Sequence, residues 1–203
     1  MASRHLPMAS EKPVSKAKSR LPPWFRTRLP NGEQQQIFND TKASVKDNKL
    51  HTVCEEAKCP NIHECWSSGD ATFMIAGDVC TRGCRFCAVN TAKTPPPLNP
   101  DEPEDLATAI ESMGINHAVI TVVNRDDLPD GGANHYRECI MAVHDRCPDV
   151  GIELLCSDLD GNLESLKILL NGLPIRVFAH NVECVPRLDK IVRDRRASFS
   201  QSL

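Results

Sequence analysis

Three cysteines stand within eight residues of the stretch GDVCTRGCRFCAVN, at residues 77–90. They are Cys80, Cys84 and Cys87. Three thiolates can hold three irons of a four-iron cluster and leave the fourth iron without a protein ligand. An open metal position is what a reactive site needs, whereas a structural site closes all of its positions. The spacing therefore predicts a 4Fe–4S cluster with one open, reactive iron.

A second triplet lies upstream, in HTVCEEAKCPNIHECW, and consists of Cys54, Cys59 and Cys65. Six of the ten cysteines thus fall between residues 54 and 87. We recognise no secretory signal before them, so their clustering favours metal or cluster ligation over disulfides. A zinc knuckle with a distant histidine is the alternative, although C-x3-C-x2-C is not a zinc-ribbon spacing. The other cysteines are expected to be small core residues: Cys139, Cys147, Cys156 and Cys184.

The composition argues against several classes of protein. Of 203 residues, 40% are hydrophobic and 25% are charged, as in an ordinary globular protein. A net charge of −3 and an aromatic content of 4% give no reason to expect nucleic-acid binding. No stretch approaches the 18 apolar residues of a membrane span, so no membrane association is expected.

The cysteines must be positioned by the elements around them. Apolar and β-branched runs predict four strands, and amphipathic stretches predict three helices between them. The predicted strands are 72–78, 117–123, 151–156 and 175–182, and the predicted helices are 101–113, 134–146 and 163–170. Such alternation indicates parallel βαβ units in a barrel or a doubly wound sheet, and the lack of GxGxxG after the first strand disfavours a Rossmann fold. The first strand leads directly to Cys80, so the loops that follow the four strands should meet at one reactive rim.

Charged residues accompany the cysteines on this rim. Arg82 and Arg85 stand within the triplet and are expected to offset the negative charge of the thiolates. Arg125, Asp126 and Asp127 follow the second predicted strand. They either position a substrate or join the loops of the rim through ion pairs, and the sequence favours neither.

The chain divides into three predicted segments. Residues 1–35 form a basic tail, since residues 1–32 carry seven Lys or Arg and a single acid, Glu11. This composition predicts disorder, and a mitochondrial or plastid presequence is the alternative. Residues 36–70 form an N-terminal extension with a helix at 36–50 and the second triplet. Residues 71–203 form the βα domain.

These motifs resemble a known family. The C-x3-C-x2-C spacing with Phe86 before its last cysteine is similar to the radical S-adenosylmethionine (SAM) superfamily. Both triplets, together with DEPEDLA, RDDLPDGGA and HNVECVPRL, resemble the lipoyl synthases from about Leu21 to the last residue. The resemblance implies an α/β fold, a partial (β/α) barrel with about four of its six βα units present. The chain is therefore expected to be truncated at its C-terminus.

The resemblance also implies an activity and two 4Fe–4S clusters. Lipoyl synthases insert two sulfur atoms at C6 and C8 of a protein-bound octanoyl-lysine, by way of a 5′-deoxyadenosyl radical. The first triplet would hold the radical SAM cluster and serve catalysis. The second triplet would hold an auxiliary cluster that gives up its sulfur. The family's fourth ligand to that cluster, a serine, has no counterpart up to residue 203, so an inactive or impaired fragment that binds one cluster is the alternative.

The resemblance further implies contacts to SAM. Phe86 would pack near the adenine. Gly131 and Gly132 would meet the amino group of the methionine part, or form a plain helix-entry turn. Asn181 and Glu183 would meet the ribose or the carboxylate, or cap the end of the fourth strand.

The implied partners are protein domains. They are octanoylated lipoyl carrier domains (E2 subunits of 2-oxoacid dehydrogenases and the glycine cleavage H protein) and an electron donor of the ferredoxin or flavodoxin type. No nucleic acid and no membrane is expected as a partner. A cytoplasmic location is expected, with the mitochondrial matrix as the alternative.

Overall fold

The central element is a sheet in the order β1-β2-β5-β6-β7, in which β1 is antiparallel to β2 and the other neighbours are parallel. The computed structural model describes residues 29–48, 50–56, 59–68 and 70–203. The strands are β1 (His51–Thr52), β2 (Thr72–Ile75), β5 (His117–Val122), β6 (Gly151–Leu155) and β7 (Val177–Ala179). The four predicted strands are therefore confirmed, and β1 is an addition that its two-residue length hides from any period-two pattern.

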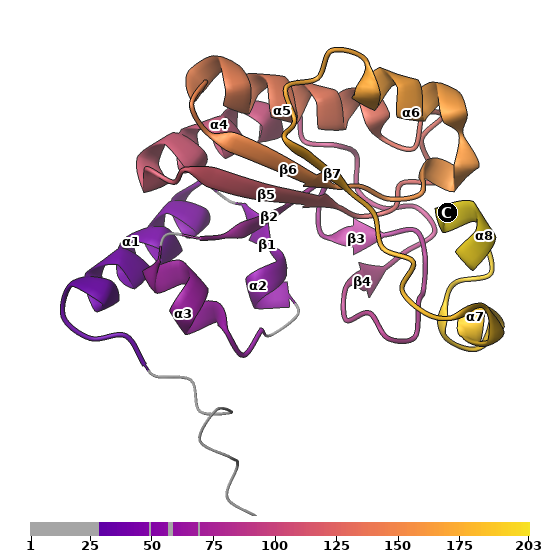
Figure 1. Ribbon diagram of the computed structural model, residues 1–203, viewed down its shortest axis with the longest axis horizontal. Helices are drawn as coiled ribbons and strands as arrows, with labels where there is room; N and C mark the ends of the chain where they lie inside the picture. The colour runs from indigo at the N-terminus through magenta and orange to yellow at the C-terminus, as the bar shows by residue number, and fades with distance from the viewer. Residues whose placement is uncertain (1–28, 49, 57–58, 69) are drawn as a thin grey trace, which may run out of the picture.

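Three helices connect the parallel strands and lie together on one face of the sheet (Figure 1). They are α4 (Glu102–Met113), α5 (Ala133–Arg146) and α6 (Leu163–Leu170). Each begins and ends within one residue of its predicted bounds. α4, for example, has three acids in its first turn and stops at Gly114, whose φ of 59° suits glycine. The α/β fold with parallel βα units, consistent with a partial barrel, is confirmed.

β7 is shorter than the strand predicted at 175–182. Its last ladder bond runs from the Cys156 N–H to the Ala179 carbonyl, at 2.9 Å. One residue later the ring of His180 contacts the Cys156 carbonyl at 2.8 Å through Nδ1. A side chain thus takes the place of the backbone partner, and the chain leaves the sheet at residue 180.

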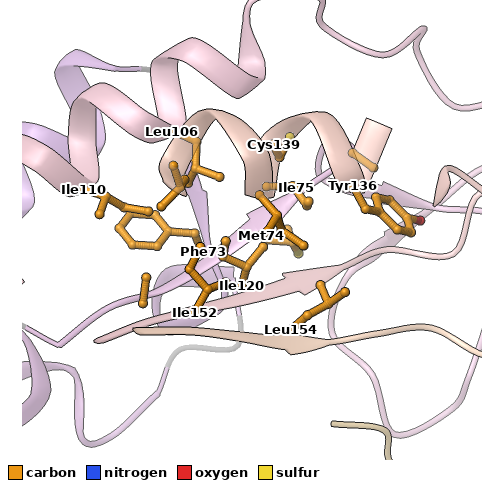
Figure 2. Packing of buried hydrophobic residues seen from close by; sticks show 14 of the residues in the cluster. Phe73, Met74, Ile75, Leu106, Ile110, Ile120, Tyr136, Cys139, Ile152 and Leu154 are labelled. Carbon is orange, nitrogen blue, oxygen red and sulfur yellow. The ribbon is translucent and has the colours of Figure 1, made fainter. Parts of the chain in front are cut away.

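The core lies between the sheet and α4 and α5, and the side-chain alternation of the strands decides which residues enter it. Phe73, Ile120 and Leu154 are register partners on three adjacent strands, and none of them is exposed to solvent. Figure 2 shows Phe73 and Ile75 beneath side chains of the two helices. Met74, between them in sequence, points to the opposite face of β2, where the cavity described below lies.

The N-terminal extension packs against this domain through α1 (Glu33–Asp47), α2 (Val53–Glu56) and α3 (Ile62–Ser67). The Thr41 hydroxyl of α1 donates to the Trp66 carbonyl of α3 at 3.3 Å, and the rings of Phe38 and Trp66 lie 5.6 Å apart. α1 begins three residues before the predicted helix. Most of the predicted basic tail, residues 1–28, lies outside the described residues, but residues 33–35 belong to α1.

The remaining elements are short. β3 (Val79–Cys80) and β4 (Asn90–Thr91) form a separate parallel pair on the side of the sheet opposite α4 and α5 (Figure 1). A 3₁₀ turn, η2 (Leu159–Gly161), follows β6, and η3 (Pro186–Leu188), α7 (Asp189–Val192) and α8 (Phe199–Ser202) follow β7. Within the described part of the chain, no helix has the length and hydropathy needed to cross a bilayer.

Candidate active site

The carboxyl ends of the four parallel strands surround a cavity of about 300 Å³. The loops after β2, β5, β6 and β7 all contribute to its lining, so the predicted convergence of these loops is confirmed. A volume of this size suits a small-molecule ligand. Six of the residues predicted from sequence line it: Cys80, Cys84, Phe86, Cys87, Asn181 and Glu183.

The chain enters the cysteine loop through a left-handed turn at the end of β2. Ala76 and Gly77 have φ values of 67° and 86°, and their N–H groups donate to the Glu102 carboxylate at 2.9 and 3.4 Å. Such a pair of N–H groups forms a small anion-binding concavity, which the carboxylate fills. His135 contacts the same carboxylate at 2.5 Å, and Arg125 donates to the Ala76 carbonyl at 3.2 Å. The start of the cysteine loop is thus fixed both by the Glu102 carboxylate, which binds its N–H groups, and by Arg125, which binds its carbonyl.

The loop that carries the first triplet closes on itself. β3 and β4 pair at its two ends, with Cys80 opposite Thr91, and the Ala92 N–H donates to the Cys80 carbonyl at 3.0 Å. Exposure increases along the loop, because Cys80 is buried, Cys84 is intermediate and Cys87 is exposed. We call residues 80–87 the cluster loop.

Neither triplet is preformed for a single ion. A tetrahedral zinc with Zn–S bonds of about 2.3 Å requires its sulfurs within about 4 Å of one another. Among the described residues, the group whose ligand atoms all lie within 4.8 Å is Glu102, His135 and Cys139, not a cysteine triplet. In that group the Glu102 carboxylate is already occupied by the turn at residues 76–77. The described residues therefore hold no cysteine triplet that is preformed for zinc.

Arg82 ties the cluster loop to the neighbouring loops. Its side chain is buried, and it pairs with Asp126 after β5 at 2.6 Å and with Asp158 after β6 at 2.7 Å. Asp160 lies 3.3 Å away and completes the set. Burial alone would raise the pKa of Asp126, but the hydrogen bonds from Arg82 and Thr81 outweigh it and lower that pKa. Three carboxylates engage its guanidinium, so the observed contacts of Arg82 are those of the rim, and its compensation of the thiolates stays a prediction.

Arg125 and Asp127, which flank Asp126, form a second ion pair on the rim. Arg125 donates to both carboxylate oxygens of Asp127, at 2.9 and 2.8 Å, and to the Pro96 carbonyl at 3.1 Å. The hydrogen bond from Arg125 lowers the pKa of Asp127, so the pair stays charged at neutral pH. Asp126 is engaged by Arg82. Of the two interpretations of residues 125–127, ion pairs that join the rim describe the observed contacts.

Two buried polar atoms on the cavity lining lack partners among the described residues: His180 Nε2 and Arg193 Nε. In a neutral imidazole, the 2.8 Å contact to the Cys156 carbonyl places the proton on Nδ1, since a carbonyl only accepts. Nε2 is then an acceptor, and Arg193 Nε is a donor. A ligand with a hydroxyl or amine and a carboxylate would satisfy both, and SAM has all three groups. The residues present therefore fit that cofactor.

Cys156 lines the same cavity but differs from the triplet cysteines. It is buried, and burial, with a smaller effect of the Asp158 charge, raises the pKa of its thiol to about 12. It therefore stays a neutral thiol. Cys139 is fully buried in the core, as predicted, whereas Cys147 and Cys184 have intermediate exposure.

Gly131 and Gly132 are absent from the described lining of the cavity and form the entry to α5 instead. Their φ values are 63° and 93°, and the Tyr136 hydroxyl lies 2.8 Å from the Gly131 carbonyl. A Cβ at Gly132 would lie 2.8 Å from the Tyr136 ring. The helix-entry alternative accounts for both glycines, and their contact with SAM stays a prediction.

The second triplet gathers on the short N-terminal elements. Cys54 lies in α2, Cys65 in α3 and Cys59 between them, with the Cys59 N–H donating to the Cys54 carbonyl at 3.0 Å. Burial raises the pKa of the Cys65 thiol, and the proximity of Cys54 and Cys59 raises it further. The three thiols are thus close enough to interact. Val53, the neighbour of Cys54, lines the cavity, so α2 reaches the site of the first triplet, although none of the three upstream cysteines belongs to the described lining.

Three of these functional residues do not follow from the sequence analysis above: Glu102, His180 and Arg193. His180 had a usable signal, since it is the polar residue directly after a predicted strand. Glu102 reads as an ordinary acid of a first helical turn, and Arg193 as one of several arginines near the end of the chain.

Comparison with known proteins gives two matches to family models. Residues 74–203 match the radical SAM superfamily, and residues 8–59 match the N-terminal domain of lipoyl synthase of the radical SAM family.

Curated relatives agree over nearly the whole chain. Proteins named "Lipoyl synthase, mitochondrial" from Leishmania braziliensis and Trypanosoma brucei gambiense are 47% and 48% identical, over 96% of this chain. The protein of that name from Bos taurus is 49% identical over 91% of this chain. The chain spans about half the length of these relatives, namely 53%, 50% and 50%. The resemblance to lipoyl synthases in the motifs thus extends along the chain, which belongs to the radical SAM superfamily.

Proposed function

We propose that this chain has lipoyl synthase activity: the radical insertion of two sulfur atoms at C6 and C8 of a protein-bound octanoyl-lysine. The observation that carries the proposal is the pair of cysteine triplets beside one cavity. One triplet suffices to make a radical from SAM, whereas sulfur insertion also needs a sulfur source. The relatives named lipoyl synthase, at 47% to 49% identity, support the same activity.

The chemistry accounts for the kind of site. C6 and C8 of an octanoyl chain carry unactivated C–H bonds, which acid–base catalysis does not break, so a cofactor must do so. A reduced 4Fe–4S cluster with bound SAM supplies a carbon radical that takes up a hydrogen atom. In our proposal Cys80, Cys84 and Cys87 hold this cluster and belong to the catalytic machinery, while Phe86 at the cavity contacts the adenine.

The remaining contacts of SAM are assigned from the cavity lining. Asn181 and Glu183 would bind its ribose or carboxylate, and the unpaired Arg193 Nε would donate to the carboxylate. Gly131 and Gly132 would act only through the turn that places α5 and Tyr136.

We assign the auxiliary 4Fe–4S cluster, the sulfur source, to Cys54, Cys59 and Cys65. Residues 36–70 would then be a cluster-bearing extension and residues 71–203 the radical SAM domain. The proximity of the three thiols and their position beside the cavity support this assignment. An impaired chain that binds a single cluster is the alternative; the presence of all six triplet cysteines supports two clusters instead.

The partners and the location follow from this activity. The substrates would be octanoylated lipoyl carrier domains, on E2 subunits of 2-oxoacid dehydrogenases and on the glycine cleavage H protein. A ferredoxin- or flavodoxin-type protein would supply electrons. The names of the relatives contain the word mitochondrial, which gives the cytoplasmic prediction no support. We therefore propose the mitochondrial matrix.

The test is product formation by the reconstituted chain. The chain is loaded anaerobically with iron and sulfide, reduced, and given SAM and an octanoyl-lysine peptide. Mass spectrometry should show the peptide with two sulfur atoms and about two molecules of 5′-deoxyadenosine per product, one for each C–H bond broken, and C65A should release 5′-deoxyadenosine without making the product. If the unaltered chain gives only 5′-deoxyadenosine, the impaired-chain alternative holds and the proposed activity is wrong.

A further inference from the structure

A segment more than a hundred residues away in sequence crosses the cluster loop. Residues 192–196, which begin with the last residue of α7, accept hydrogen bonds from two of its backbone N–H groups. The Arg85 N–H donates to the Val192 carbonyl at 2.8 Å, and the Gly83 N–H donates to the Asp194 carboxylate at 3.1 Å. Figure 1 shows α7 near the loop that joins β3 and β4. We call residues 192–196 the crossing segment.

The crossing segment also reaches a cysteine sulfur. The Asp194 N–H lies 3.3 Å from Cys84 Sγ, a distance suitable for an N–H···S hydrogen bond. On the other side of the loop, the Arg82 N–H lies 3.3 Å from Cys80 Sγ. Hydrogen bonds to cluster sulfurs, local charge and solvent exposure set the reduction potential of an iron–sulfur cluster. Asp194 provides two of these three factors at Cys84: its N–H is the hydrogen bond to the sulfur, and its carboxylate is a nearby negative charge.

Asp194 is held in place by its own neighbours. Arg196 donates to its carboxylate at 2.9 Å and lowers its pKa, so Asp194 stays ionised near neutral pH. Arg196 also donates to the Thr81 carbonyl at 2.5 Å and pairs with Asp126 at 3.2 Å. The crossing segment is therefore joined to the same charged frame that holds Arg82.

We propose that the crossing segment is a built-in clamp of the cluster loop, and that Asp194 sets the electron affinity of the cluster. Asp194 is a positioning residue in this proposal, because it acts through Cys84. Its N–H bond stabilises added negative charge on the sulfur, whereas its carboxylate opposes it. The inference depends on the superfamily's cluster at the first triplet and not on the sulfur-insertion step.

The clamp is tested in the chain without its clusters, by hydrogen–deuterium exchange of the peptide that spans residues 80–87. D194A removes the acceptor of the Gly83 N–H, and R196A removes the donor to Thr81. Both should exchange about tenfold faster in this peptide, which corresponds to about 1.4 kcal/mol. R195A removes an exposed neighbouring arginine and should leave exchange unchanged. Unaltered exchange in D194A would overturn the clamp.

The effect on the cluster is tested by redox titration of the loaded chain, followed by the EPR signal that changes on addition of SAM. D194N keeps an oxygen for the Gly83 N–H and the backbone bond to Cys84 but removes the charge. The reduced cluster should become about tenfold easier to form, a rise of about 59 mV for one electron. R195A should shift the potential less than D194N does. An unchanged midpoint in D194N would overturn the role of Asp194.

The two readouts separate this inference from the proposed function. Neither exchange nor the midpoint depends on product formation. Failure to insert sulfur would therefore leave both results intact. If D194A does not fold, exchange in R196A still tests the clamp, and D194N still tests the midpoint.

Discussion

The two cysteine triplets are alike in number and different in their support. Cys80, Cys84 and Cys87 stand in a loop closed by a strand pair and framed by a buried arginine with three acids. Cys54 and Cys65 stand on helices of four and six residues, and Cys59 lies between these helices, joined to Cys54 and to Ile62 by backbone hydrogen bonds. Helices this short have little stability of their own.

The difference matches two chemical demands. A cluster that presents one open iron to a cofactor at every turnover must keep its geometry. A cluster that gives up sulfide must tolerate loss of its own atoms. The charged frame at the first triplet and the lighter support at the second fit the two roles that we propose, and the following changes test whether the contrast holds.

The largest effect is expected from R82A. It would leave the buried carboxylate of Asp158 without its cation and Asp126 with Arg196 alone, and breaking such a buried pair costs about 3–5 kcal/mol. Denaturant unfolding measures the loss, and iron at the first triplet should fall further than iron at the second. K167A, which removes the exposed pair with Glu164, should cost less than about 1 kcal/mol. Equal losses of unfolding free energy in R82A and K167A would show that the ion pairs of Arg82 do not stabilise the first triplet.

E102A should come next. It leaves the N–H groups of Ala76 and Gly77 without their acceptor, and an unsatisfied buried group costs about 1–3 kcal/mol. Exchange should rise at residues 76–80, and the cluster at the first triplet should load more slowly. E104A removes an exposed acid of the same helix and should change neither. If E102A slowed cluster loading at the second triplet and not at the first, the predicted difference between the two triplets would be contradicted.

T41V addresses the other triplet. It keeps the shape of the side chain and removes the hydroxyl that donates to the Trp66 carbonyl, at a cost of about 1 kcal/mol. Because α3 carries Cys65, a chelator should remove iron faster from the second triplet, with no change in the SAM-sensitive EPR signal. S112A, at an exposed hydroxyl contact between Ser44 and Ser112, is the control.

The smallest effect is a dependence on pH. The folded pKa values of Asp126 and Asp127 are lowered from 3.8, so their stabilisation is complete above that value and is lost as the pH falls through the lowered folded values. The free energy of unfolding should therefore drop as the pH falls below about 4, and D126N should flatten this drop. A profile of D126N with the same slope as the unaltered chain would speak against the ion pair.

Much of the fold was predictable because it depends on local pattern. The strands and helices follow apolar periodicity, and glycine marks the end of α4 at Gly114. The reactive rim follows from one fact, that Cys80 comes directly after a strand. In parallel sheets the carboxyl ends of the strands meet at one edge, so the loops at Asn181 and Glu183 could be placed as well.

The rest depended on contacts between distant residues. No local sequence pattern predicts that Arg82 forms ion pairs with three acids. Nor does one predict that the Asp194 N–H donates to Cys84 Sγ. The glycines at 131 and 132 show a second limit. A positive φ and a close ligand both require glycine, so the residue type alone does not distinguish a helix entry from a binding turn.

The central claim is that the triplets hold two separate clusters, of which the first alone responds to SAM. Iron analysis and EPR with and without SAM test it directly, on the unaltered chain, on C80A/C84A/C87A and on C54A/C59A/C65A. Since each cluster holds four irons, we expect about eight irons in the unaltered chain. We expect about four irons and no SAM response in C80A/C84A/C87A, and about four irons with a full SAM response in C54A/C59A/C65A. A SAM response that survives in C80A/C84A/C87A, or no more than about four irons in the unaltered chain, would contradict the account.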